Sequence, residues 1–186
     1  MSYPTKPAFV HVGTWDDETR KHPAMKWMEQ YTIEFNKRGD WSKEESDWLT
    51  QRAWQLSKDA VLIKPDGSVH KGNADAFKEA KAVYSAFTSE FHEPYFLICV
   101  DTDDGWEMIG TAHMFANCQG TPTAAEKKVK DLQGREWDVK IPGGFHFYYA
   151  KQSKAAHDGI VLKKTEILCD SMPAVQILLA RGVLKL

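Results

Sequence analysis

The sequence predicts an α+β fold, because helical patterns come first along the chain and strand patterns follow. Amphipathic or capped helical segments occupy much of residues 22–87, whereas four apolar, aromatic-rich strand segments occupy much of residues 95–170. A run of helices followed by a run of strands is typical of helices packed on one face of a sheet. With 186 residues, of which 42% are hydrophobic, the chain can bury a sizeable core. We expect a single domain over residues 22–186, preceded by an N-terminal arm over residues 1–21.

Three helices are expected before the long strands. The first spans about residues 22–37, where aromatic residues recur at intervals of four and mark the buried side. The second spans about residues 42–57 and begins with a Ser-Lys-Glu-Glu capping box. The third spans about residues 73–87 and is capped by its first residue, an asparagine. A short hairpin that turns at Lys64-Pro65-Asp66-Gly67 separates the second helix from the third.

Four long strands are expected after the helices. They cover residues 95–101, 106–118, 137–150 and 159–170. The Asp158-Gly159 pair predicts a turn before the last strand, because glycine accepts a positive φ angle without steric cost. Pro142-Gly143-Gly144 predicts a bulge or a sharp bend inside the third strand. We therefore expect antiparallel pairing with one irregularity.

Two further segments flank this sheet pattern. Residues 119–136 are polar and contain glycine and proline, which predicts a long excursion from the sheet with one helical turn near residues 124–132. Residues 171–182 predict a final helix, because a proline lies in the first turn and a glycine follows the last turn.

Composition and motifs exclude several classes of function. The 24 basic and 26 acidic side chains give a net charge of -2, which offers no broad attraction for nucleic acid or an anionic membrane. The sequence contains no membrane-spanning apolar run and no signal-peptide core, and its three scattered cysteines fit reduced, packed thiols, so we expect a soluble cytoplasmic protein. It has no phosphate loop, nucleophile elbow, dinucleotide fingerprint or zinc-ligand spacing. We therefore expect no cofactor and no metal.

The order of elements also resembles a known superfamily. The resemblance rests on Asp59-Ala60-Val61-Leu62 leading into Pro65-Asp66-Gly67, on the third helix after Gly72, and on the last strand running into Asp170-Ser171. This layout is similar to the nuclear transport factor 2-like superfamily, in its SnoaL-like branch of polyketide cyclases and scytalone dehydratase-like proteins. The resemblance implies a cone-shaped α+β barrel, in which three N-terminal helices cover a curved antiparallel sheet and a C-terminal helix follows. It also implies a ligand pocket in the cone and a homodimer.

Strand alternation places candidate site residues on shared faces. In residues 145–150, His146 and Tyr148 point to one face, and the aromatic residues between them point to the other. His113 and Asn117 share a face of the preceding long strand. If both faces are concave, these four side chains converge in the cone. A histidine can move protons near neutral pH, while tyrosine and asparagine can donate hydrogen bonds to an enolate oxygen.

The predicted catalytic residues are His113 and His146, together with Asp59 at the mouth of the cone. The predicted substrate-binding residues are Tyr148, Asn117, Trp27, Tyr31 and Glu166. Each also has a structural interpretation, as a hydrogen-bonded framework histidine, a turn residue, an exposed ion pair or part of an aromatic core. Parity leaves open which face is concave. The other histidines, among them His70 and His92, are assigned no role.

Two classes of function follow from these residues and from the resemblance. The first is a cofactor-independent lyase, isomerase or cyclase that acts by general acid/base catalysis on a hydrophobic polyketide- or terpenoid-like small molecule. The alternative is a non-catalytic small-molecule-binding or dimeric interaction protein on the same fold. The expected partners are a hydrophobic ligand and a second copy of the chain, with no nucleic acid and no membrane.

Overall fold

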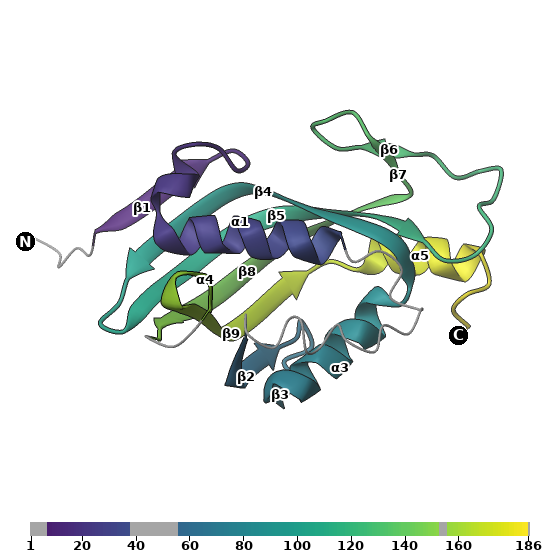
Figure 1. Cartoon of the computed structure of the whole chain (residues 1–186). Helices are drawn as coiled ribbons and strands as arrows, with labels where there is room; N and C mark the ends of the chain where they lie inside the picture. Colours follow the sequence, from purple (N-terminus) through teal and green to yellow (C-terminus); the bar gives the residue numbers. More distant parts are fainter. Residues whose placement is uncertain (1–6, 38–55, 153–155, 186) are drawn as a thin grey trace, which may run out of the picture.

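One seven-stranded sheet is the largest feature of the structure (Figure 1), a computed structural model that describes residues 7–37, 56–152 and 156–185. Its strands are β1 Ala8–Val12, β2 Leu56–Ile63, β3 Val69–Lys71, β4 Phe87–Asp101, β5 Gly105–Cys118, β8 Val139–Lys151 and β9 Ile160–Cys169. Their order is β1-β4-β5-β8-β9-β2-β3. Neighbouring strands pair antiparallel except β2 and β9, which run parallel. The sheet is therefore mixed, and not wholly antiparallel as predicted.

Helices pack against the sheet. They are α1 Pro23–Asn36, α3 Asn73–Tyr84 and α5 Met172–Ala180, with the short η1 Thr19–Lys21 before α1 and the short α4 Ala156–Gly159 before β9. Figure 1 shows α1 lying across one face of the sheet, which we call the inner face; the opposite face is the outer face. None of the helices among the described residues has the length and apolar character needed to cross a membrane.

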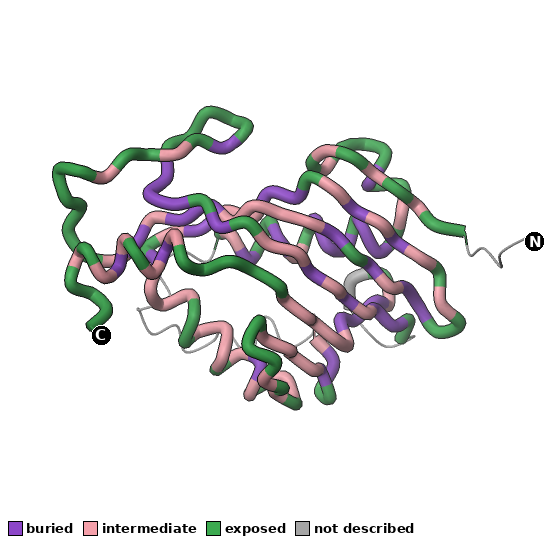
Figure 2. The backbone as a smooth tube through the Cα atoms, turned by 180° about the vertical axis from the view of Figure 1, so that it is seen from behind, coloured by how far each residue is buried: buried purple, intermediate pink, exposed green. Residues whose placement is uncertain are grey.

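The main core lies between α1 and the inner face. It is formed by Ala24, Met25, Trp27 and Met28 of α1 and by Leu97, Cys99, Trp106, Met108, Phe145, Phe147, Tyr149, Ile160 and Leu162. Because side chains alternate along a strand, burial of Phe145, Phe147 and Tyr149 against α1 directs His146 and Tyr148 to the outer face. Figure 2, a view from behind, shows the strands on the near side with α1 beyond them.

A second core lies where α5 meets the sheet. Ala174 and Leu178 of α5 cluster with Phe87, Ala116, Cys118, Val139 and Ile141. The helix α3 packs instead against β2 and β3. The inner face is thus covered in sections, with α1 over its centre and α5 at one end.

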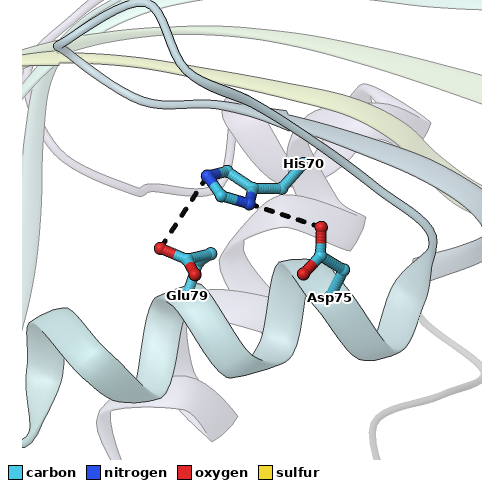
Figure 3. Close-up of side chains that lie close together, drawn as sticks. All are labelled: His70, Asp75 and Glu79. Atoms are coloured by element: carbon cyan, nitrogen blue, oxygen red, sulfur yellow. Dashed lines mark ion pairs between the residues drawn. The ribbon is translucent and has the colours of Figure 1, made fainter.

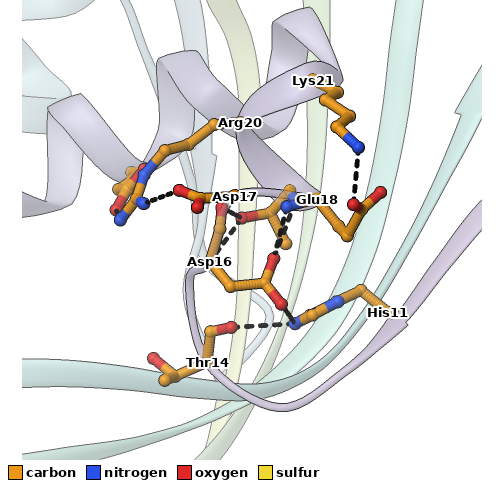
Figure 4. Close-up of polar contacts among 9 residues, drawn as sticks. His11, Thr14, Asp16, Asp17, Glu18, Arg20 and Lys21 are labelled. Carbon is orange, nitrogen blue, oxygen red and sulfur yellow. Dashed lines mark hydrogen bonds and ion pairs between the residues drawn. The ribbon is translucent and has the colours of Figure 1, made fainter.

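The segment before α1 is attached to the rest of the domain (Figure 4). Asp16 Oδ1 accepts a hydrogen bond from the backbone N–H of Thr19 at 2.9 Å, which closes the turn into η1. Arg20 makes a two-point ion pair with Glu29 of α1, at 2.9 and 2.7 Å. Since β1 also pairs with β4, residues 7–21 of the predicted arm are fixed both to the sheet and to α1.

Residues 119–136 leave the sheet as predicted, but they form a small hairpin and not a helical turn. Its strands, β6 Val129–Lys130 and β7 Glu136–Trp137, pair antiparallel. The carboxylate of Asp131 accepts hydrogen bonds at 2.9 Å from the backbone N–H of Arg135 and from the indole N–H of Trp137. These local bonds satisfy the turn and compete with a helix. The predicted helical turn is therefore wrong.

A buried arginine joins this excursion to α5. The Arg181 side chain is 1% exposed, and its guanidinium donates to the Cys118 carbonyl oxygen at 2.6 Å and lies 2.9 Å from an Asp138 oxygen. Glu126, within the excursion, accepts hydrogen bonds from Arg181 Nε at 3.1 Å. One side chain thus connects the end of α5, the end of β5 and the excursion.

The predicted helices agree with the structure in part. The first and last helices form where expected, as α1 and α5. The third begins as predicted, but its N-cap is Gly72, with a φ of 90°, and not Asn73. The predicted second helix lies outside the described residues, except for Leu56 and Ser57, which belong to β2.

The predicted strands also agree in part. The turn at residues 64–67 joins β2 to β3, and the Asp158-Gly159 pair takes positive φ angles of 59° and 69° before β9. β4 begins at Phe87, well before the predicted start. Pro142-Gly143-Gly144 pairs in regular register, so the predicted bulge is absent there; the register of β8 with β9 shifts between Tyr148 and Tyr149 instead.

Replacing Arg181 by methionine should destabilise the domain, because the carboxylate of Asp138 would be left buried without its guanidinium partner. Removing one partner of a buried ion pair costs about 3 kcal/mol or more, which lowers the midpoint of thermal unfolding by roughly 6–12 °C in a chain of this size. Calorimetry would measure the shift. The matched control is Lys128→Met, which removes the half-exposed partner of the same carboxylate and should cost less than about 1 kcal/mol. Equal shifts in the two variants would contradict this account.

Candidate functional site

The predicted residues of the last two long strands lie together on the outer face. His146 Nε2 is 2.5 Å from a Glu107 oxygen, and His146 Nδ1 is 3.6 Å from a Glu166 oxygen. The Tyr148 ring packs beside the imidazole with its centroid 4.5 Å away. Cross-strand pairing produces this cluster, because Glu166 lies directly opposite His146, and Glu107 directly opposite Tyr148. His146, Tyr148 and Glu166 are therefore neighbours, but not on the face that α1 covers.

The other predicted polar residues are occupied elsewhere. The His113 ring stacks on Tyr95 of β4 with centroids 4.4 Å apart, and burial together with the charge of Lys140 lowers the pKa of His113. Asn117 uses its amide N–H to donate to Ser89 Oγ at 3.0 Å.

Asp59 is an exposed residue within β2, where its carboxylate lies 3.5 Å from Lys163 Nζ. The nearby Ser57 hydroxyl, the backbone N–H of Asp59 and the charge of Lys163 lower the pKa of Asp59. None of the contacts of Asp59 involves His113 or His146, so the predicted catalytic residues do not form one cluster.

The two predicted aromatic residues of α1 lie on the inner face. The Trp27 ring stacks on the Tyr31 ring with centroids 5.4 Å apart and meets the Tyr149 ring edge-on at 5.3 Å. Phe35 follows one turn further along α1, 5.9 Å from Tyr31. These three positions are four residues apart, so α1 presents a continuous row of rings to the sheet.

At the end of this row, His92 of β4 forms a polar network that the sequence prediction missed. His92 Nδ1 lies 2.9 Å from Asn36 Oδ1, and His92 Nε2 lies 3.0 Å from the Tyr84 hydroxyl. The Phe35 ring meets both aromatic partners edge-on, with centroids 5.5 Å from His92 and 5.0 Å from Tyr84. The last residue of α1, the last residue of α3 and the centre of β4 therefore meet at one point.

The backbone determines the tautomer of His92. The His92 backbone N–H, which can only donate, points to Asn36 Oδ1 at 3.3 Å. The atom of Asn36 that faces it must be an oxygen, and the imidazole Nδ1 that contacts the same oxygen must carry a proton. Nε2 is then the acceptor, and the Tyr84 hydroxyl donates to it. This arrangement makes His92 Nε2 a base that is already hydrogen-bonded to a phenol.

A buried carboxylate shares this part of the inner face. Glu90, which is 3% exposed, lies two residues before His92 and pairs with Ala116 of the second core. Burial and, after it, the negative charge of Glu90 raise the pKa of Tyr84 far above its usual value. Burial lowers the pKa of His92 to about 4. At neutral pH the site therefore holds a protonated phenol and a neutral imidazole.

The sequence carried a signal for these residues. Phe87 and Phe91 point to a strand before Pro94, and reading that strand would place Glu90 and His92 on one face. A strand that runs through Pro94 is hard to recognise from the sequence, because proline within a strand pattern usually marks the end of the strand or a bulge. The structure resolves the conflict with a register shift between Pro94 and Phe96, after which β4 continues.

A separate hollow lies at the N-terminal end of α1. It has a volume of about 370 Å³ and is broadly open. Its walls are formed by Pro23, Trp106, Lys151, Gln152, Asp158, Gly159 and Ile160. Lys151 Nζ sits over the Trp106 ring, 4.5 Å from its centroid. This hollow contains none of the predicted site residues and none of the His92 network.

No protein-family model matches the sequence, and no match is found among curated protein sequences. Solved structures do share its fold. A hexachlorocyclohexane dehydrochlorinase LinA-type3 from Novosphingobium barchaimii LL02 is 13% identical, with a TM-score of 0.55 over 83% of this chain and 91% of that chain. A putative SnoaL-like polyketide cyclase from Jannaschia sp. CCS1 is 12% identical, with a TM-score of 0.50 over 82% and 91%.

A nuclear transport factor 2-like superfamily protein from Salmonella enterica serovar Typhimurium LT2 gives the same picture. It is 12% identical, with a TM-score of 0.53 over 82% of this chain and 92% of that chain. The chain thus has a mixed α+β fold of the nuclear transport factor 2-like class. Within that class, the SnoaL-like proteins are among its structural neighbours, as the sequence resemblance implied. Identities this low show the fold alone.

Stability should fall in acid because of His92. Its pKa is lowered from 6.5 to about 4 in the folded chain, so between these values the unfolded chain binds a proton that the folded chain does not. The free energy of unfolding therefore decreases as the pH falls through this window, by up to about 3 kcal/mol from this residue. Urea unfolding at several pH values should show a weaker pH dependence in His92→Gln.

The matched control for this experiment is His113→Gln. The pKa of His113 is also lowered, but the residue lies on the outer face, so its removal should change the pH dependence less. If His92→Gln keeps the full decrease of the parent protein, the neutral buried imidazole is excluded.

Proposed function

We propose that the chain is a cofactor-independent lyase, isomerase or cyclase, and that its site is the inner face at His92 and not the outer face at His146. The observation that carries this proposal is the hydrogen bond from the Tyr84 hydroxyl to His92 Nε2, beside the buried carboxylate of Glu90. Fold neighbours described as a dehydrochlorinase and a putative polyketide cyclase support the same class of reaction.

The aromatic row along α1 supports a hydrophobic substrate. Trp27, Tyr31 and Phe35 present rings toward the sheet, and the Tyr149 ring faces them from β8. Flat or polycyclic apolar molecules of a polyketide- or terpenoid-like kind would stack on such rings. In this proposal the sheet, α1 and α3 form the walls of a cone, and the predicted substrate residues Trp27 and Tyr31 keep their role.

The Tyr84–His92 pair can move a proton without a cofactor. As the Tyr84 oxygen takes a proton from a carbon next to a substrate carbonyl, the phenol proton passes to His92 Nε2. Because the negative charge of Glu90 disfavours an ionised phenol, Tyr84 keeps a proton throughout the transfer. Return of the proton to a leaving group gives elimination, and its return to another carbon gives isomerisation. The low pKa of His92 makes its imidazole a weak base. Asn36 contacts Nδ1 and holds the ring in place, and it therefore acts as a positioning residue.

One observation favours the alternative, a non-catalytic binding protein. Both nitrogens of His92 already have partners in the domain, which is how a framework histidine is held. The inner-face aromatic rings alone would then bind a hydrophobic ligand. The catalytic roles predicted for His113, His146 and Asp59 stay predictions, and their contacts on the outer face and on β2 give them no shared substrate position.

Native mass spectrometry of the purified chain would find a co-purifying small molecule, and chemical identification of that molecule before and after incubation would show turnover. An enzyme should convert the ligand, and His92→Gln and Tyr84→Phe should each lower the rate by about 10²–10⁴-fold. Tyr148→Phe on the outer face is the matched control and should keep the rate. A retained ligand that is never converted identifies a binder. Loss of turnover in Tyr148→Phe, with full activity in His92→Gln, would move the site to the outer face.

We also propose that the outer face is the contact surface of a homodimer. It exposes the apolar side chains of Val10, Val12, Tyr95, Ile109 and Leu168. Among the described residues no helix covers this face (Figure 2). Glu107 and Glu166 beside His146, with Lys164 3.1 Å from Glu166, give mixed charges that two copies related by a twofold axis can pair.

Light scattering after size-exclusion chromatography would test the dimer. Ile109→Glu places a charge in the middle of the outer face, where the parent side chain is 47% exposed, and should shift the dimer toward monomer. Val83→Glu, at a side chain 49% exposed on α3, is the matched control and should stay dimeric. A monomeric parent protein, or dissociation by the control alone, would exclude this interface.

A further inference from the structure

We propose that His70, Asp75 and Glu79 form a binding site for a divalent transition metal, with Zn²⁺ as the best-suited ion. His70 lies on β3, and the two carboxylates lie on the facing side of α3 (Figure 3). Each residue can offer a ligand atom such that all three atoms lie within 4.8 Å of one another. Within the described ranges, this is the one such group of three histidine, cysteine or acidic residues.

The elements that carry the three residues bring them together. Asp75 and Glu79 are four residues apart, so they lie one above the other on the same side of α3. Asp75 Oδ2 is 3.3 Å from His70 Nδ1, and Glu79 Oε2 is 3.8 Å from His70 Nε2. Zinc bonds of about 2.0–2.2 Å separate tetrahedral ligand atoms by about 3.4 Å. The distance between Asp75 Oδ2 and His70 Nδ1 already matches this separation, whereas Glu79, which faces Nε2, would have to turn toward a metal bound at Nδ1.

The neighbours of His70 favour Nδ1 as the nitrogen that binds the metal. Ser68 Oγ lies 3.3 Å from His70 Nε2 and is itself 2.6 Å from Asp66 Oδ1. A metal-bound histidine usually donates its other N–H to such an oxygen, which orients the ring. Ser68, which is bonded to Asp66, would thus orient the His70 ring through Nε2, while Asp75 and Glu79 supply the other two protein ligands of the metal.

Charge and exposure also fit a metal with one open position. The His70, Asp75 and Glu79 side chains are 20%, 45% and 20% exposed, so the site is accessible to a hydrated ion. Three protein ligands leave the fourth position to water, as in open zinc sites. An imidazole nitrogen with two carboxylates suits Zn²⁺ better than the all-oxygen ligand sets of Mg²⁺ or Ca²⁺.

Lys64 provides a competitor within the site. Its ammonium lies 3.0 Å from Glu79 Oε2, where it holds one of the carboxylates that the metal needs. Metal binding would displace this ammonium and would tie β3 to α3, the helix that ends at Tyr84. Removing the charge of Lys64 should therefore strengthen binding, an effect that a merely structural ion-pair cluster does not produce.

Isothermal titration of the untagged, chelator-treated full chain with zinc chloride tests the proposal. We expect one ion per chain and at least about tenfold weaker binding in His70→Ala, since loss of a ligand costs no less than loss of an outer-shell partner. Lys64→Gln should bind more tightly than the parent chain. His146→Ala is the matched control, because His146 also lies between two glutamates and is the rival site; it should bind zinc as the parent does.

Three results of the titration would overturn the proposal: no zinc binding by the parent chain, unchanged affinity in His70→Ala, or loss of binding in His146→Ala. The first of these results is measured on the parent chain, so it remains decisive even if a variant fails to fold. Cobalt(II) bound in place of zinc should give the visible absorption of a four-coordinate site with one nitrogen and oxygen ligands. An octahedral spectrum without histidine coordination would also exclude the site.

Discussion

The contact between the aromatic row of α1 and the inner face is the interaction on which the rest of the molecule depends. Trp27 and its neighbours bury one side of the helix against β4, β5 and β8, and this burial decides which face of the sheet becomes interior. Once Phe145, Phe147 and Tyr149 are committed to that side, strand alternation leaves His146 to the outer face. The positions of both histidine clusters follow from this one packing choice.

The same contact explains why the pKa of His92 on the inner face is strongly lowered. It also explains why the side chains around His146 on the outer face are open to solvent. His92 lies where α1 and α3 end over β4, so water is removed from its ring and the neutral form is favoured. His146 remains between two partly exposed glutamates. Chemically similar sets, a histidine with tyrosine and glutamate, therefore differ in their exposure to water because they lie on opposite faces of one sheet.

The sequence predicted the periodic parts of the fold and failed where two local signals compete. Spacing of four in α1 and alternation in β8 predicted correctly which side chains share a side. Alternation has no information about which face a distant helix covers, so it could not choose between His146 and Phe147 as the inner residue. That choice is made by contacts between α1 and β8, which are more than one hundred residues apart in the chain.

The local errors have a common cause. Pro94 and Pro142-Gly143-Gly144 each signal an interruption, yet the sheet continues through both, with a register shift only at the first. Pairing of β4 with β5 around Pro94, and of β8 with both of its neighbours at Gly143 and Gly144, outweighs the local preference of one or two residues. His92 was missed because the predicted strand began at residue 95, whereas β4 begins at Phe87 and includes His92.

The parallel pair of β2 and β9 has a consequence for how the chain assembles. Val61 faces Lys164 in this pair, so the β2–β3 hairpin has no neighbour in the sheet until β9 has been synthesised. Pairings over so long a separation form slowly, because closing the loop costs entropy before any contact compensates it. During that interval the edge of β2 that later pairs with β9 has no partner, and a strand of another chain could pair with it. We therefore expect any dependence on a chaperone during synthesis to arise from the long separation between β2 and β9, and not from the folded site.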